Sequence, residues 1–286
     1  MRQALLAFAL PLALLSALVS RPILAEEPRL SGDFRQGGLI IGEVEPGSRV
    51  YFGGQAVRVG TRGRFALGLG RQAPERVPLA WRRPDGTFHQ REVEVTQRRY
   101  ETQRINGLSE NLIHPDDEAL ERIRQEQERV RQARAGFSAL EAFRAKFIWP
   151  VKGPVTGIYG TRRILNGEPR QPHYGIDIAA SAGTPVRAPA GGIVKLVEPN
   201  LYFSGGTLIL DHGHGVSSSF LHLRRVQVQE GSQVSQGQVI ASVGSTGRST
   251  GPHLDWRINW FDKRLDPSLL AGPMPATESK QANRGG

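Results

Sequence analysis

The fold is decided by residues 171–180, QPHYGIDIAA, which place an imidazole and a carboxylate four residues apart among β-prone residues. In a β-strand, the side chains at positions i, i+2 and i+4 lie on the same face. His173 and Asp177 are therefore expected to point the same way, and Gly175 leaves open space between them. This spacing predicts one half of a metal site.

Residues 251–258, GPHLDWRI, provide the other half, because His253 and Asp255 share one face of a second predicted strand. Two such strands side by side would bring four donors of the zinc-binding type into one pocket. Each pair alone is a weak signal and is more often a hydrogen-bonded structural pair. However, five of the seven histidines fall between positions 173 and 253, and this clustering favours a functional constellation.

Residues 1–25 are predicted to be a signal peptide, with Arg2, an apolar run over 4–19 and the small residue Ala25 before two acidic residues. The alternative is an uncleaved signal anchor. The sequence contains no cysteine, so neither disulfides nor a lipid-anchored cysteine is available. No later segment is long and apolar enough to span a bilayer. We therefore expect an exported protein with no stable membrane span after signal cleavage.

The formal charge of +10 favours association with polyanions or acidic surfaces. An exported protein meets cell-wall polymers and anionic lipids before it meets nucleic acid. Nucleic acid is therefore not expected as a partner.

The chain is predicted to be mainly β. Residues 26–100 contain short β-prone runs with turn formers every eight to twelve residues, which predicts a small domain that resembles a β-sandwich. It carries His89 but no cluster of chemically active residues. Its expected role is targeting, spacing or regulation, and plain structural support is an equal alternative.

Residues 101–148 are predicted to be a helical connector. From Asp116 to Phe147 the chain is rich in Glu, Arg, Gln and Ala, and Pro115 with three acidic residues suits a helix N-terminus. A narrow apolar stripe predicts one helix, or two that are broken near Gly136. A connector packed on one of the domains is favoured over a coiled-coil dimer, because the repeat is short.

Residues 149–270 are predicted to be an antiparallel β domain, because no long amphipathic pattern separates its strands. Residues 271–286 are expected to be a disordered tail. The predicted strands cover residues 155–159, 184–188, 192–197, 206–210, 216–221, 237–243 and 253–259.

This C-terminal region resembles the lysostaphin-type, or LytM-domain, zinc endopeptidases, which cut peptide bonds in peptidoglycan. The resemblance rests on several blocks in the same order: GIYG at 157–160, HYGIDIA at 173–179, GTPV at 183–186, APAGG at 188–192, LDHG at 210–213, FLHL at 220–223, GSTG at 244–247 and TGPHL at 250–254. It implies the fold of that peptidase domain and one bound Zn²⁺ per chain.

The resemblance also implies roles for particular residues. His173 and Asp177 match the first two zinc ligands, and His222 and His253 match the two catalytic imidazoles that flank the reacting water. The third ligand position holds Asp255, where the family pattern has histidine. Relatives that have lost ligands act as non-catalytic activators of other wall hydrolases.

Asp255 is chemically compatible with the third position. Its carboxylate oxygen is the same number of bonds from Cα as the Nδ1 of histidine, and aspartate is an ordinary zinc ligand. Two carboxylates and one neutral imidazole would cancel the +2 charge of zinc, so the site should polarise water less strongly. We expect slower chemistry or a higher pH optimum, and a relative gain for harder metals such as manganese.

Four further residues are expected to contact the substrate: Tyr159, Arg163, Asn166 and His212. Arg163 and Asn166 belong to residues 162–170, which are predicted to be a polar loop ahead of the first ligand. Arginines in this loop suit the carboxylates of stem peptides, and a solvated loop is the alternative. Packing for Tyr159 and a structural role for His212 are also open.

Taken together, the residues and the resemblance predict a metal-dependent endopeptidase that hydrolyses peptide cross-links of bacterial peptidoglycan. The family resemblance suggests the periplasm as its place and the bond between D-alanine and diaminopimelate as its target. The alternative is a weak or inactive domain that binds the wall and activates an amidase.

Overall fold

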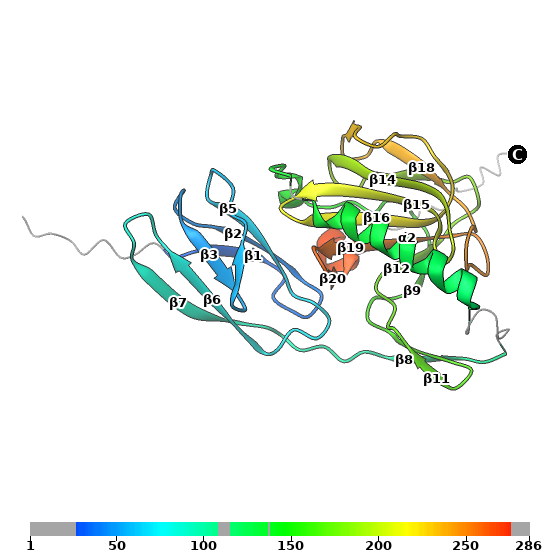
Figure 1. Cartoon of the computed structure of the whole chain (residues 1–286), viewed down its shortest axis with the longest axis horizontal. Helices are drawn as coiled ribbons and strands as arrows, with labels where there is room; N and C mark the ends of the chain where they lie inside the picture. The colour runs from blue at the N-terminus through cyan, green and yellow to red at the C-terminus, as the bar shows by residue number, and fades with distance from the viewer. Residues whose placement is uncertain (1–26, 108–114, 137, 276–286) are drawn as a thin grey trace, which may run out of the picture.

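The computed structural model describes residues 27–107, 115–136 and 138–275, and the predicted signal peptide and residues 276–286 lie outside this part. Two regions of β-structure lie side by side, and a helix crosses in front of the C-terminal one (Figure 1). The prediction of a mainly β chain with a helix between two β regions is confirmed.

The N-terminal region consists of two small sheets. One has the strand order β1-β2-β5 and the other β4-β3-β6-β7. Ile40 and Phe65 of the first sheet and Leu79 and Trp81 of the second share one buried core. The alternating burial along β6 reflects one face on this core and one toward solvent. The strands are β1 (Arg29–Gly32), β2 (Leu39–Glu43), β3 (Arg49–Phe52), β4 (Gln55–Val57), β5 (Arg64–Gly68), β6 (Arg76–Arg82) and β7 (Phe88–Glu94).

The C-terminal region is built on a ten-stranded sheet whose main order is β17-β14-β15-β16-β19-β12-β9. Its strand pairs are antiparallel, as predicted. The elements are β9 (Val155–Gly157), β12 (Ile176–Ala179), β13 (Pro185–Arg187), β14 (Gly192–Leu201), β15 (Gly205–Gly213), β16 (Val216–Val226), β17 (Gln233–Val234), β18 (Val239–Val243), β19 (His253–Trp260), β20 (Lys263–Leu265) and the short helix α3 (Pro267–Ala271).

The central strands of this sheet hold its core. Leu210, Phe220, Trp256 and Ile258 are fully buried. Full burial of a large apolar side chain contributes about 1.5–3 kcal/mol relative to exposure. The pairing of β16 with β19 and of β19 with β12 is therefore strongly fixed.

The expectation of a loop over residues 162–170 is wrong. This segment is a hairpin of β10 (Arg162–Leu165) and β11 (Glu168–Arg170), and β8 (Thr102–Ile105) pairs with β10 in parallel. Asn166 and Gly167 both have positive φ, at 46° and 86°. An Asn-Gly pair with positive φ at both positions is the preferred two-residue hairpin turn, so this signal was present in the sequence.

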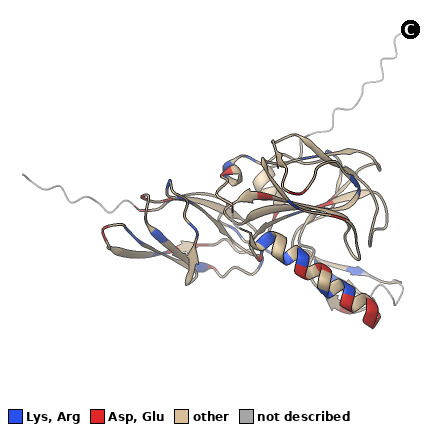
Figure 2. Ribbon diagram, turned by 45° about the horizontal axis from the view of Figure 1, so that its top comes forward, with Lys and Arg blue, Asp and Glu red and all other residues tan. Residues whose placement is uncertain are grey.

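Helix α2 (Asp117–Ala135) begins as predicted. The Asp116 side chain caps it by accepting a hydrogen bond from the Ala119 amide, and two acidic residues occupy its first turn. Figure 2 shows acidic and basic residues alternating along this helix. The helix packs on β14 and β15, with Ile123 buried.

The helical prediction fails beyond Gly136. Among the described residues of 138–147 there is only the 3-10 turn η1 (Ala142–Arg144). Phe143 and Phe147 are buried in the core of the C-terminal sheet. An extended path lets both rings reach that core, so tertiary packing overrides the local helical preference.

The two β regions share a contact surface. Leu39 and Ala66 of the N-terminal region belong to the C-terminal core. The Arg98 guanidinium lies 2.8 Å from the buried Asp266 carboxylate. Among the described residues, no helix combines the length and apolarity needed to cross a bilayer.

We predict that Gly213→Ala lowers the free energy of unfolding by about 2–5 kcal/mol. Gly213 has φ of 95°, and an added Cβ would collide with the Leu140 backbone carbonyl. Denaturant titration measures the loss. Gly231→Ala is the matched control, because Gly231 has φ of 82° with open space around it. A loss as large in the control would contradict the role of the close contact.

Candidate active site

The predicted adjacency of the two motif strands is confirmed: β12 and β19 are antiparallel neighbours, and Asp177 lies opposite Asp255. Glycines leave room for both carboxylates. A Cβ on Gly157 would collide with the Asp177 carboxylate, and a Cβ on Gly175 would collide with that of Asp255. The two acidic side chains therefore occupy space that only glycine neighbours allow.

His173 reaches this pair from outside the strand, because β12 begins at Ile176. The prediction that His173 lies on the strand is therefore wrong, although its ring still meets Asp177. The distance from His173 Nε2 to Asp177 Oδ1 is 3.2 Å. The ring is buried, and neither of its nitrogens has a hydrogen-bond partner among the described residues.

These features fit a metal ion. One ligand atom from each of His173, Asp177 and Asp255 lies within 4.8 Å of the other two. In a tetrahedral zinc site with bonds near 2.0–2.2 Å, ligand atoms are about 3.4 Å apart. A buried imidazole without a partner is costly unless an unplaced group satisfies it. One nitrogen and two carboxylate oxygens are a suitable donor set for a divalent cation.

Asp255 also forms an ion pair with Arg257. The guanidinium donates from Nη2 to Oδ2 at 2.6 Å and from Nε to Oδ1 at 3.0 Å. Burial alone would raise the pKa of the Asp255 carboxyl, but the charge and hydrogen bonds of Arg257 hold that pKa well below its usual range. Asp255 is therefore ionised, and lone pairs remain on its oxygens for a cation.

His222 and His253 form a pair beside this group, with ring centroids 4.7 Å apart. The Nδ1 of His222 lies 2.7 Å from the Thr246 carbonyl oxygen, and that of His253 lies 2.8 Å from the Gly251 carbonyl oxygen. A carbonyl only accepts hydrogen bonds, so Nδ1 carries the hydrogen in each ring. In the neutral rings, Nε2 is then left with a free lone pair.

The backbone at His222 is unusual, with φ of 62°. Pairing of β16 with β19 reaches Leu221, and pairing with β18 begins at Leu223. His222 sits where the strand changes partners, and a positive φ at such a residue is a form of strain often found at functional sites. Burial lowers the pKa of His222, which favours the neutral base near pH 7.

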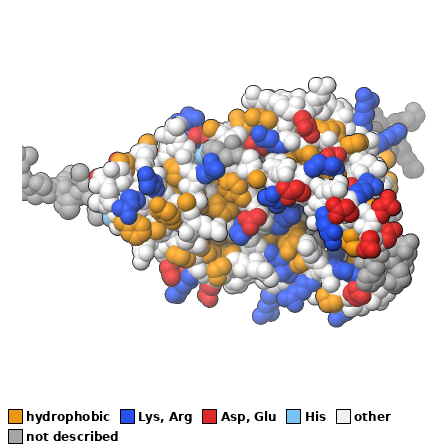
Figure 3. Space-filling view, viewed as in Figure 1, with side chains coloured by type: hydrophobic (Ala, Val, Ile, Leu, Met, Phe, Trp, Pro, Cys, Tyr) orange, Lys and Arg blue, Asp and Glu red, His pale blue; other side chains and the backbone are white. Residues whose placement is uncertain are grey.

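A groove of about 1740 Å³ contains all five of these side chains, and α2 forms part of its wall. Seven arginines line it: Arg131, Arg134, Arg163, Arg170, Arg248, Arg257 and Arg264. Figure 3 shows basic side chains spread over the whole face that it draws, with several close together below its centre. Neither the helical wall nor most of these arginines was predicted from the sequence.

Two of the four residues expected to contact substrate belong to the 162–170 hairpin. Arg163 lines the groove, with Nη2 3.6 Å from Asp177 Oδ2. Asn166 occupies the hairpin turn and is not among the groove-lining residues.

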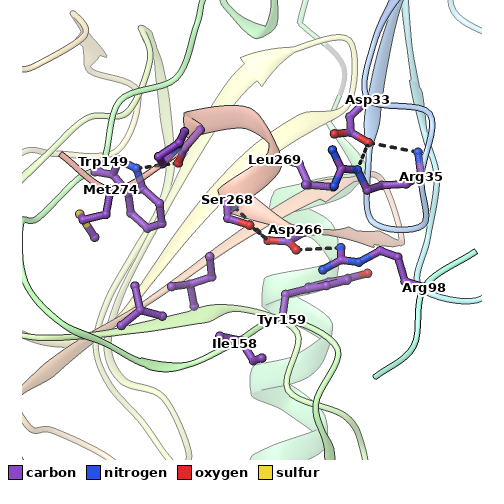
Figure 4. Close-up of a pocket in the computed structure, with 14 residues that line it drawn as sticks. Asp33, Arg35, Arg98, Trp149, Ile158, Tyr159, Asp266, Ser268, Leu269 and Met274 are labelled. Atoms are coloured by element: carbon purple, nitrogen blue, oxygen red, sulfur yellow. Dashed lines mark hydrogen bonds and ion pairs between the residues drawn. The ribbon is translucent and has the colours of Figure 1, made fainter. Parts of the chain in front are cut away.

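The other two do not reach the groove. The Tyr159 hydroxyl donates to the Arg264 carbonyl oxygen at 2.8 Å, and its ring borders a separate hollow of about 560 Å³ (Figure 4). His212 is fully buried, with its ring nitrogens 2.7 Å from the Gly191 carbonyl and the Ser218 hydroxyl. Both side chains are packed inside the protein, which agrees with the alternative of a packing or structural role for each of them.

The antiparallel sheet presents one imidazole, two carboxylates and two free imidazole bases in one groove. Metal-dependent hydrolysis uses these groups. Residues 171–267 match the model of peptidase family M23. A crystal structure from Pseudomonas aeruginosa, of a protein assigned to peptidase M23, is 30% identical with a TM-score of 0.66 and covers 84% of this chain and 96% of that one. The chain belongs to peptidase family M23.

Curated relatives match the C-terminal region. DD-carboxypeptidase/endopeptidase Mpg of Neisseria meningitidis serogroup B is 40% identical over 112 residues, which are 39% of this chain and 25% of Mpg. Peptidoglycan DD-endopeptidase ShyA of Vibrio cholerae is 39% identical over 110 residues, which are 38% of this chain and 25% of ShyA. The matched part thus spans about a quarter of each of these relatives.

We predict that stability falls on acidification partly through His212. Burial lowers the pKa of this ring to about 4, against about 6.5 in an unfolded chain. Between these two pH values the His212 ring is protonated in the unfolded chain but neutral in the folded one. The free energy of unfolding therefore rises with pH in this range. From pH 7 to pH 5 the ring should cost about 2 kcal/mol.

Denaturant titration of the wild type and of His212→Asn at both pH values measures this contribution. The variant is less stable at pH 7 and should lose less stability on going to pH 5. An equal loss in the two proteins would assign the pH dependence to other groups.

Proposed function

We propose that the protein is a zinc-dependent endopeptidase that hydrolyses peptide cross-links of bacterial peptidoglycan. One observation carries the proposal. The His173 ring, whose nitrogens have no hydrogen-bond partner among the described residues, meets Asp177 and Asp255 beside two imidazoles with free Nε2 atoms. Metal-assisted hydrolysis of an amide uses both a Lewis acid and a positioned base, and the groove supplies places for both.

His173, Asp177 and Asp255 would hold the Zn²⁺ ion. When bound, zinc supplies a Lewis acid and lowers the pKa of a water molecule to about 7. Arg257 keeps Asp255 ionised and adds a positive charge beside it. The pair therefore carries no net charge, as a neutral histidine would, which offsets the weakening of the site expected from a second carboxylate.

His222 and His253 move protons in this mechanism. The Nε2 atom of one ring takes the proton of the attacking water, and a proton then passes to the nitrogen of the leaving amine. The hydrogen bonds from Nδ1 to backbone carbonyls fix the ring orientation and leave Nε2 as the basic atom. A positioned general base contributes about 10²–10⁴ in rate.

The substrate assignment is supported by the names of the relatives. Mpg is named a DD-carboxypeptidase/endopeptidase and ShyA a peptidoglycan DD-endopeptidase. The basic groove suits stem peptides, which carry free carboxylates. We propose the bond between D-alanine and diaminopimelate as the one that is cut, and the periplasm, reached through the signal predicted at residues 1–25, as the place of action.

The second candidate is a domain that binds the wall without cutting it and activates an amidase. The ion pair between Asp255 and Arg257 favours this candidate, because the third ligand already has a partner without any cation. The two candidates differ in metal content and in the products released from the wall.

We predict that the purified protein carries about one zinc ion per chain and converts cross-linked muropeptides of purified sacculi into uncrosslinked ones. A chelator should stop the reaction and added Zn²⁺ should restore it. His222→Gln should lower the rate by about 10²-fold or more, because it removes a proton acceptor. Chromatography of the released muropeptides and metal analysis provide the measurements.

His89→Gln is the matched control, because His89 lies on β7 of the N-terminal region and stacks on Trp81. It should leave the rate unchanged. Metal-free protein that binds sacculi but leaves the cross-links intact would overturn the peptidase and support the second candidate.

A further inference from the structure

The groove holds a cluster of three arginines that the proposed chemistry does not use fully. Along β19, Arg257 and Asn259 follow Asp255 at two-residue spacing and so lie on the same face. Register places Ser219 of β16 opposite Arg257 and Arg264 of β20 opposite Asn259. The sheet therefore brings two guanidinium groups together at one end of the metal-donor group.

Helix α2 adds a third guanidinium from above the sheet. Arg134 donates from Nη2 to the Ser219 hydroxyl at 3.0 Å, and Ser219 is the residue opposite Arg257. Arg134, Arg257 and Arg264 all line the same groove. A cation from the connector and two from the sheet thus face one region of space.

Negative charge in this cluster is too small to balance it. Asp255 pairs with Arg257. Among the described residues, no carboxylate lies within ion-pair distance of Arg134 or Arg264. Arg264 instead donates to the Asn259 side-chain oxygen at 3.2 Å, and the buried Nε of Arg134 has no hydrogen-bond partner.

This arrangement costs free energy unless an anion enters. Burial, followed by repulsion from Arg264 and Arg257, lowers the pKa of Arg134 well below its usual value. Burial, followed by repulsion from Arg257, lowers the pKa of Arg264 to about 10. Three guanidinium groups held together in a partly dehydrated part of the groove form a preorganised anion site. The free energy needed to bring these cations together is already included in the folded state, so it does not oppose binding.

We propose that Arg134, Arg257 and Arg264 bind a free carboxylate of the substrate peptide beside the metal-donor group. A guanidinium fork matches a carboxylate with two parallel hydrogen bonds. Arg257 lies about 7 Å along the strand from Asp255, since a strand rises about 3.3–3.4 Å per residue. A carboxylate on the residue next to the bond to be cut has the required reach.

This inference rests on the proposed function for its ligand, since a peptidoglycan cross-link is the source of the carboxylate. Its test uses binding and not cleavage. The probes are two forms of one stem peptide that ends in diaminopimelate and D-alanine, one with the free side-chain carboxylate of diaminopimelate and one with a carboxamide in its place. Calorimetry with the metal-free full chain measures Kd for each.

The wild type should bind the free acid at least tenfold more tightly than the carboxamide. Arg264→Gln should reduce this preference to about twofold or less, and Arg134→Gln should reduce it in the same direction. Arg134 lies on α2, so its variant keeps the test open if Arg264→Gln fails to fold. Arg225→Gln is the matched control, because Arg225 is exposed on β16 outside the groove, and it should keep the full preference.

Equal binding of the two peptides by the wild type, or an unchanged preference in both groove variants, would overturn the inference. The outcome is separate from that of the sacculus experiment. A preference for the acid without cleavage removes the proposed function alone, whereas cleavage without such a preference removes the arginine site alone.

Discussion

The pairing of Asp177 with Asp255 across β12 and β19 is the constraint on which the rest of the site depends. Like charges directly opposite each other on neighbouring strands destabilise a sheet. Trp256 and Ile258, on the opposite face of β19, are fully buried in the core and fix the register of the strand despite this repulsion. The surrounding positive groups, with Arg257 on one carboxylate and Arg163 near the other, follow from the need to balance that charge.

Asp255, the third proposed ligand, illustrates how neighbouring residues can balance an acidic side chain. A carboxylate in place of an imidazole would add a negative charge to the proposed metal site. Arg257, two residues further on the same face, adds the opposite charge at 2.6 Å. Aspartate and arginine together carry the net charge of a neutral histidine, so the net charge around a cation bound here would be the same although the donor would be oxygen and not nitrogen.

The sequence was sufficient to predict that Asp177 and Asp255 lie on strands and which neighbouring side chains share their face, because alternate side chains of a strand point to the same side. That the two strands pair is seen in the structure. The sequence also predicted the antiparallel sheet and the start of α2 at its cap. It was insufficient for His173, which reaches the donor group from an extended segment before the strand. Tyr159 and His212 were misplaced because their orientation depends on packing partners far along the chain, such as Arg264 and Ser218. Arg257 was recognisable in principle, since it shares a face with Asp255.

The helical wall of the groove lies outside the segment that matches the family model. Residues 171–267, which match the family model, contain the proposed metal donors and both proposed bases. They do not contain Arg134 or the rest of α2, which close the groove from the side of the connector. A graft of the matched segment onto another scaffold would thus transfer the proposed metal donors and bases but not Arg134, the groove-lining arginine nearest the end of α2.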